Sequence, residues 1–111
     1  MAIDAFAALV EFKSELLDWA RHASASSDDE RQKIQQVLDL RGELSEQLDA
    51  LVGLDLATAL KGLPEEAALL EKATETMNSV QKDIAKVQQV LDTAGTVLSV
   101  VAKLATVVVA A

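Results

Sequence analysis

Glu15, Asp18 and His22 are the residues of this chain whose types and spacing come closest to a metal site. At positions i, i+3 and i+7 of a helix their side chains share one face, and carboxylates and imidazoles are ligands of transition metals. Di-iron sites in helical bundles, however, draw carboxylates and E-x-x-H pairs from several helices, and the chain has no E-x-x-H. The three residues also lie opposite an apolar stripe, so we expect them in water and predict no metal ligands.

Residues suited to acid–base or nucleophilic catalysis are scarce. The chain has one His, no Cys and no Tyr, and it lacks both a glycine-rich phosphate loop and a G-x-S-x-G turn. The serines between positions 24 and 27 are explained by helix capping. The sequence therefore predicts a protein that is not an enzyme, with no catalytic residue and no cofactor.

Two cations fall near apolar stripes. Heptad counting from Ile34 puts Arg41 in a core position, but a stripe through Leu40 leaves it at the edge, with its stem on apolar surface and its head in water. We favour the edge, because buried arginine is rare. Lys103 is either the solvent marker of an otherwise apolar segment or a side chain that reaches from lipid to the interface.

Helical periodicity defines the elements that carry these residues. From 3 to 24, the spacing predicts a helix whose buried stripe is Leu9, Phe12, Leu16 and Trp19. Ser27 and Glu30 form an S-x-x-E capping box, which starts a second helix over 28–52. Its stripe is Ile34, Val37, Leu40, Leu44, Leu48 and Leu51, and Gly42 lies within it.

The rest of the chain reads as a short turn of helix followed by a long one. Asp55 is placed to cap a helical turn over 55–61, and Gly62 is placed to end it. Pro64 suits the first position of the next helix, which we predict to run unbroken over 64–110. An unbroken heptad spacing supports this helix, through Leu70, Ala73, Met77, Val80, Ile84, Val87, Leu91, Ala94, Leu98, Val101, Ala105 and Val108.

Composition bounds the class of protein. The chain has 111 residues, half of them apolar and only 3% aromatic, which is typical of one helical domain over 1–111. Its formal net charge of −8 disfavours binding to nucleic acid. No basic residue precedes Lys13, so the N-terminus does not resemble a signal peptide, and we expect a cytoplasmic protein with membrane association left open.

Together these patterns predict an all-α fold, an antiparallel three-helix bundle with a long C-terminal helix. The alternative is a four-helix bundle in which the chain bends at Gly95. At 1.5 Å per residue, a helix over 64–110 would be about 70 Å long, so its end would project beyond the other two helices. From Ala94 onward this segment has almost no polar face.

The exposed end suggests a function in assembly. We predict a non-enzymatic interaction or assembly module that forms a homodimer, or binds a helical partner, through its C-terminal helix. The interface residues would be Leu98, Val101, Leu104, Ala105 and Val108. The alternative is a membrane-active protein whose residues 94–111 insert into lipid.

Overall fold

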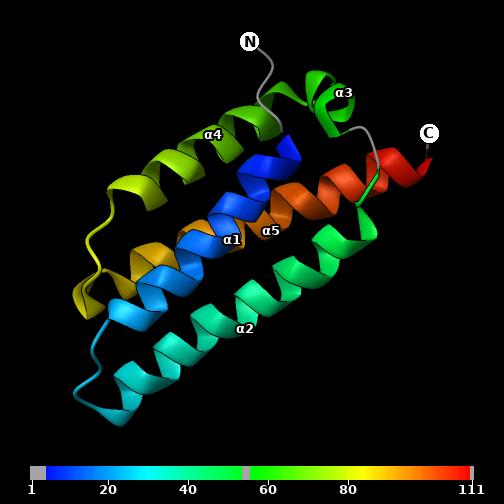
Figure 1. Cartoon of the computed structure of the whole chain (residues 1–111). Helices are drawn as coiled ribbons and strands as arrows, with labels where there is room; N and C mark the ends of the chain where they lie inside the picture. The colour runs from blue at the N-terminus through cyan, green and yellow to red at the C-terminus, as the bar shows by residue number, and fades with distance from the viewer. Residues whose placement is uncertain (1–4, 54–55, 111) are drawn as a thin grey trace.

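The computed structural model describes residues 5–53 and 56–110, where the chain forms five α-helices and no strand. Four helices are long: α1 (Ala5–His22), α2 (Asp28–Ala50), α4 (Pro64–Ser79) and α5 (Val87–Ala110). They lie lengthwise beside one another, and the short α3 (Leu56–Lys61) sits at one end of them (Figure 1). The predicted all-α class is therefore confirmed, and the long C-terminal helix packs against α2 and α4.

Helix α1 supplies the large side chains of the core. All four residues of its predicted stripe are at most 1% exposed: Leu9, Phe12, Leu16 and Trp19. Helix α1 packs against α2 on one side and α4 on the other, so these side chains fill the space between the long helices. The predicted helix over 3–24 is confirmed from position 5 to 22, and positions 3 and 4 lie outside the described residues.

A modified capping box starts α2. The Ser27 hydroxyl accepts a hydrogen bond from the Glu30 N–H at 3.2 Å, as predicted. The Glu30 carboxylate does not return to Ser27, but accepts from the N–H of Ser26 at 2.8 Å and from its hydroxyl at 2.7 Å. The Ser26 N–H thereby lowers the pKa of Glu30. The N–H groups of Ser26 and Glu30 therefore both have side-chain acceptors, so the two residues on either side of the helix start satisfy one another as in a capping box.

The connection from α2 to α4 runs through α3. Helix α2 ends at Ala50, two residues before the predicted end, and Gly53 adopts a φ of 83°, a conformation that favours glycine. The predicted helical turn appears as α3, whereas its expected cap, Asp55, lies outside the described residues. Pro64 is the first residue of α4, as predicted.

The unbroken helix predicted over 64–110 is wrong. Helix α4 ends at Ser79, the chain turns, a short 3-10 helix η1 (Ile84–Lys86) follows, and α5 begins at Val87. Figure 1 shows α4 and α5 side by side and running in opposite directions. The described chain is only 47 Å in its longest dimension, so no part of it spans the expected length. The alternative bend at Gly95 is also wrong, because α5 continues through that residue.

The physical cause of the turn lies partly in α1. The indole Nε1 of Trp19 donates to the backbone oxygen of Gln81 at 3.1 Å, and Lys82 forms an ion pair with Asp18. Locally, the Asp83 carboxylate caps η1 by accepting from the Ala85 N–H at 3.0 Å. These contacts hold residues 81–83 in a turn against the end of α1. If α4 continued past Ser79 as one helix, the end of α1 would lose these contacts.

Helix α5 buries a face slightly rotated from the predicted one. Three predicted positions are buried: Val87, Ala94 and Val101. Three others are only half-buried: Leu91, Leu98 and Ala105. The residues one position earlier are buried in their place: Val90, Val97 and Leu104. Because α5 packs against both α2 and α4, its buried face is centred between those two neighbours.

Candidate functional site

The predicted interface residues do not form one surface. Val101 and Leu104 have no exposed area, because both belong to the chain's own core. Leu98 and Ala105 are half-buried at the edge of that core, and the side chain of Val108 lies outside the described part of the structure. Within the described residues, the long helix whose end was expected to project does not form, because the chain turns after α4 and α5 packs back along α4. An interface on α5 remains a prediction, and it can use only outward positions.

The outward face of α5 is uncharged over three turns. No charged residue lies between Asp92 and Lys103, and the exposed positions there are small: Gly95, Ser99 and Ala102. The Thr96 hydroxyl donates to the Asp92 backbone oxygen at 3.0 Å. Because that hydroxyl is satisfied within the helix, Thr96 needs no water or partner to complete its hydrogen bond. This face is therefore small and weakly polar.

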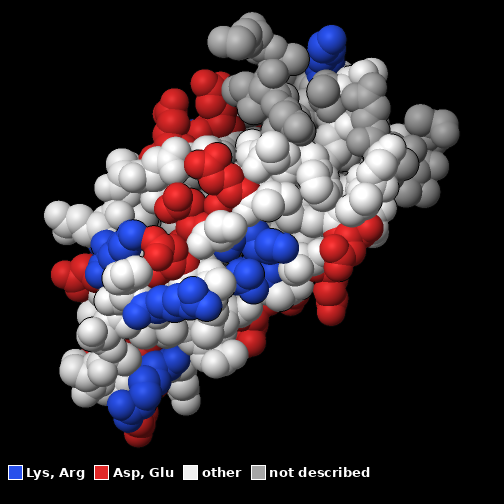
Figure 2. All heavy atoms as spheres, in the orientation of Figure 1, with Lys and Arg blue, Asp and Glu red and all other residues white. Residues whose placement is uncertain are grey.

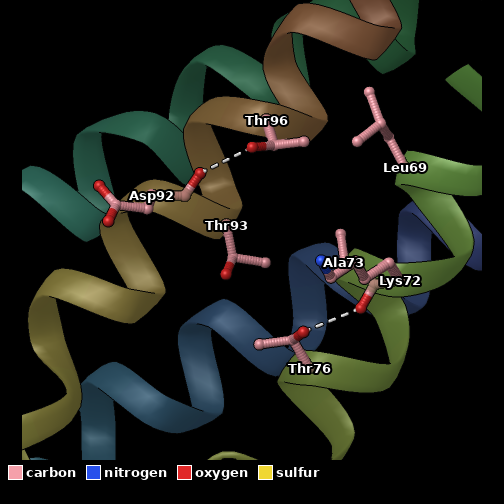
Figure 3. A pocket seen from close by; sticks show the side chains of 7 residues that line it. All are labelled: Leu69, Lys72, Ala73, Thr76, Asp92, Thr93 and Thr96. Carbon is pink, nitrogen blue, oxygen red and sulfur yellow. Dashed lines mark hydrogen bonds between the residues drawn. The ribbon is translucent and has the colours of Figure 1, made fainter. Parts of the chain in front are cut away.

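A pocket of about 180 Å³ lies beside this face, between α4 and α5. Its lining residues are Leu69, Lys72, Ala73 and Thr76 from α4 and Asp92, Thr93 and Thr96 from α5. Figure 3 shows these side chains around the space between the two helices, with Leu69 facing Thr96. A shallow depression continues from the pocket along Gly95 and Ser99. We call the pocket and the depression together the α4–α5 groove.

The charges that border the α4–α5 groove are of opposite sign. Lys72 lies on the α4 wall and Asp92 on the α5 wall, and neither has an ion-pair partner within the described ranges 5–53 and 56–110. The Asp92 carboxylate accepts one hydrogen bond from the Gln88 amide at 3.0 Å. Leu69 lies on α4 between Lys72 and the end of the helix that is nearer α3, and it is 45% exposed. The groove thus combines an exposed apolar side chain with one free charge of each sign.

An ion pair joins α4 and α5 nearer α3. Lys103 Nζ lies 2.6 Å from a carboxylate oxygen of Glu66, whose side chain is only 11% exposed. The hydrogen bond from Lys103, and then the backbone N–H of Glu66 itself, lower the pKa of that carboxyl, and the same bond raises the pKa of Lys103. Lys103 is half-exposed and satisfies a buried carboxylate, a role that sequence reasoning missed. Only the α4–α5 hairpin brings these two residues together.

The residues first considered for metal binding lie at the turn after α4. Asp18 is paired with Lys82, whose hydrogen bond lowers the pKa of Asp18, and His22 Nδ1 lies 2.8 Å from the Asp18 backbone oxygen. Among the described residues, no group of three or more His, Cys, Asp or Glu side chains could hold a metal ion. The position of Asp18 thus has a structural explanation in the α4–α5 turn.

Arg41 of α2 is partly buried, between the core and edge positions considered for it. It is half-buried, and its Nε is buried without a hydrogen-bond partner. Nearby, one turn along α2, Ser45 accepts from Lys13 Nζ of α1 at 3.3 Å. Figure 2 shows Lys and Arg atoms in several patches from the middle to the lower left of the view, interspersed with acidic side chains.

One described segment, Ile84–Val107, is long and apolar enough to cross a membrane by length and composition. Its most apolar window has a mean hydropathy of 1.5, and 33% of that window is buried within the fold. Core helices of soluble proteins also meet this criterion. Comparison of the chain with models of known protein families, with curated protein sequences and with solved structures finds no match.

Proposed function

We propose that this protein is a non-enzymatic assembly module that joins copies of itself, or a helical partner, through the outward face of α5. In this proposal the four long helices form a bundle of two antiparallel hairpins, α1–α2 and α4–α5, which presents that face on a rigid support. The observation that carries it is the uncharged face between Asp92 and Lys103 beside the α4–α5 groove.

The contrast with α2 supports this assignment. Helix α2 exposes charged residues along its whole length, as expected for a surface that stays in water, whereas α1 exposes Val10 as well as charged residues. On α4 and α5, by contrast, Leu69 is 45% exposed and Val107 is 38% exposed, and small residues lie between them along α5. Leu69 lies beside the uncharged face of α5, and exposed apolar residues next to such a face mark interaction sites more often than isolated ones do.

Sedimentation across a range of protein concentrations tests the proposal. We expect the wild-type chain to self-associate and Ala102→Glu, which adds a charge to the exposed face, to weaken association strongly. Gln36→Glu is the matched control, since Gln36 is exposed on α2 and the substitution adds the same charge. A strict monomer at high micromolar concentration would overturn self-assembly, and association that Ala102→Glu leaves intact would overturn assembly through the outward face of α5. Val101→Glu is unsuitable, because Val101 is in the core.

A membrane-active protein is the second candidate, favoured by the apolar segment Ile84–Val107. Insertion would require α5 to leave the core, where Val97 and Val101 are completely buried. Flotation with lipid vesicles and leakage of an enclosed dye measure this activity directly. Binding and leakage by the whole chain, both reduced in Ala102→Glu, would support the membrane function, and no flotation at any lipid concentration would reject it.

A further inference from the structure

We propose that two copies of this chain exchange their α5 helices by opening the α4–α5 hairpin at residues 80–86, which we call the hinge. In the exchanged dimer, α4 and α5 of each copy form one continuous helix, and α5 of one copy packs against α2 and α4 of the other. This inference goes beyond the proposed assembly function, because exchange does not use the outward face of α5. It rests on the backbone of the hinge, the apolar spacing across it and the ion pair that joins the two helices.

The hinge contains no residue that must end a helix. It has no glycine or proline, and among the described residues only Gly53 has a positive φ. Helix α4 therefore ends without the left-handed cap that stops many helices. The Val80 N–H still makes a helical bond to the Thr76 oxygen at 2.8 Å, and the chain leaves the helix only because Val80 has an extended ψ of 138°. The Asp83 carboxylate, which caps η1, is the local signal for the turn.

Tertiary contacts with α1 hold the hinge closed. Trp19 Nε1 donates to the Gln81 backbone oxygen at 3.1 Å, and Lys82 pairs with Asp18. The side chains of Asp18 and Lys82 are 43% and 46% exposed, so water screens this pair and it contributes little to holding the turn. Opening the hinge loses these contacts, and a helix that continues through 80–86 gains backbone hydrogen bonds in their place. The closed and open hinges therefore differ by few interactions.

Exchange keeps the contacts that α5 makes with the core. In one chain α5 packs against α2, α3 and α4, and Val97 and Val101 are completely buried there. A second copy offers the same surfaces, so after exchange each of these contacts forms between two chains instead of within one. Because the core is rebuilt without change, the free-energy cost of opening is confined to the hinge.

The ion pair between α4 and α5 gives the register of the exchanged helices. Lys103 Nζ lies 2.6 Å from a carboxylate oxygen of Glu66, and in the dimer each such pair joins one copy to the other. The two-fold axis then crosses the continuous helices midway between positions 66 and 103, near Ile84 and Ala85. This point lies inside the hinge, where the two chains must cross.

Apolar side chains of the hinge meet at this axis. Val80 and Ile84 keep the helical spacing that runs from Met77 to Val87, and both are only half-buried in the single chain. In two antiparallel helices that cross near Ile84, this stripe faces the other copy and packs against its counterpart. Exchange therefore buries apolar surface that the closed chain leaves partly in water, which favours the dimer at high protein concentration.

Refolding of the whole chain from urea at low and at high micromolar concentration, followed by sedimentation, tests the exchange. Gln81→Pro should block it. Val80 already has the extended backbone that precedes a proline, and the Gln81 N–H makes no backbone hydrogen bond within the described residues, so the closed turn accepts proline. A continuous helix does not. Because each dimer has two hinges, we expect the dimer to weaken at least about a thousandfold.

Gln81→Ala is the matched control, since it removes the same exposed side chain but favours a helix, and it should dimerise as the wild type does. Circular dichroism checks that each variant is folded. Gln81→Gly provides a second test that does not depend on the proline variant folding. It should dimerise about twentyfold more weakly than Gln81→Ala, because glycine lowers helix propensity at both hinges.

A cross-link provides a second measurement, because the chain has no cysteine. One protein carries Glu66→Cys and another carries Lys103→Cys, so neither chain has both thiols. When the two are refolded together at high concentration, exchange brings the thiols of different chains close enough for a short bifunctional maleimide to join them. The same proteins refolded separately at low concentration, then mixed and tested at once, are the control and should not be joined.

A dimer of the wild type and Gln81→Ala that Gln81→Pro abolishes, with a cross-link only after joint refolding, would support exchange. A dimer that Gln81→Pro and Gln81→Gly leave intact, or a cross-link that is absent after joint refolding, would overturn it. If Ala102→Glu dissociates that remaining dimer, the proposed function stands without exchange. Exchange that Ala102→Glu does not affect would leave this inference standing without the proposed function, and a chain that stays monomeric after refolding at high micromolar concentration would overturn both.

Discussion

The two glycines inside long helices give a paired prediction. Gly42 in α2 and Gly95 in α5 are both exposed, and a Cβ added at either would meet nothing within 4 Å. Alanine at these positions therefore gains helix propensity without any steric cost. We expect Gly42→Ala and Gly95→Ala each to raise the free energy of unfolding by about 0.8 to 1.0 kcal/mol. For a domain of this size, that corresponds to a rise in melting temperature of about 3 to 6 °C.

Urea unfolding followed by circular dichroism measures both changes, at a concentration below that of self-association. The double variant should show the sum, because the two sites lie on different helices and share no neighbour within reach of their added methyl groups. A measurement of self-association should then distinguish the two alanine variants. Because Gly95 lies on the outward face of α5 that the proposed assembly uses, Gly95→Ala should alter self-association, and Gly42→Ala on α2 should not. Destabilisation of the monomer by either alanine would refute this account of the exposed helix faces.

Three further predictions concern the core and the polar contacts. Trp19→Phe should lower the free energy of unfolding by about 1 to 3 kcal/mol, because it leaves a cavity and removes the hydrogen bond to Gln81; denaturation followed by circular dichroism measures it. Leu44→Ala, at a side chain that is 1% exposed, should cost about 2 to 5 kcal/mol in the same assay. Lys103 holds the pKa of Glu66 below its usual range, so this carboxylate stabilises the fold fully above its unfolded pKa. That contribution should disappear as the pH falls through the lowered folded pKa, which NMR titration of the carboxyl measures.

Each of these predictions has a matched comparison. Phe12→Leu also removes aromatic volume from the core but no hydrogen bond, so only Trp19→Phe should increase amide exchange in residues 81–83. Leu40→Ala should cost less than Leu44→Ala, since Leu40 is half-buried. Lys103→Gln should raise the pKa of Glu66. An unchanged pKa in that variant would show that the ion pair does not cause the shift.

Local patterns in the sequence predicted much of the fold. The spacing of Leu9, Phe12, Leu16 and Trp19 identified the buried face of α1, because one face of a helix recurs every three to four residues. Ser27 marked the start of α2 through chemistry that acts within four residues, and Pro64 marked the start of α4 for the same reason. The candidate site was less accessible. The groove residues Leu69 and Asp92 are neighbours only because two helices fold onto each other.

The turn between α4 and α5 depended on tertiary structure. Met77, Val80, Ile84 and Val87 keep helical spacing across the break, since both helices face one core, so periodicity alone could not distinguish a hairpin from a continuous helix. Cap-type residues such as Asp83 were a local signal for the turn.

Local sequence therefore determined where most helices begin and which faces are apolar, because capping and periodicity act over a few residues. Whether the last apolar stretch projected from the fold or folded back onto it depended on partners far along the chain. Trp19 and Gln81, which hold the turn, are 62 positions apart, and Glu66 and Lys103 meet only across the finished hairpin. Such contacts form only when helices pack, and packing removes from water the valines that an extended helix would have left exposed.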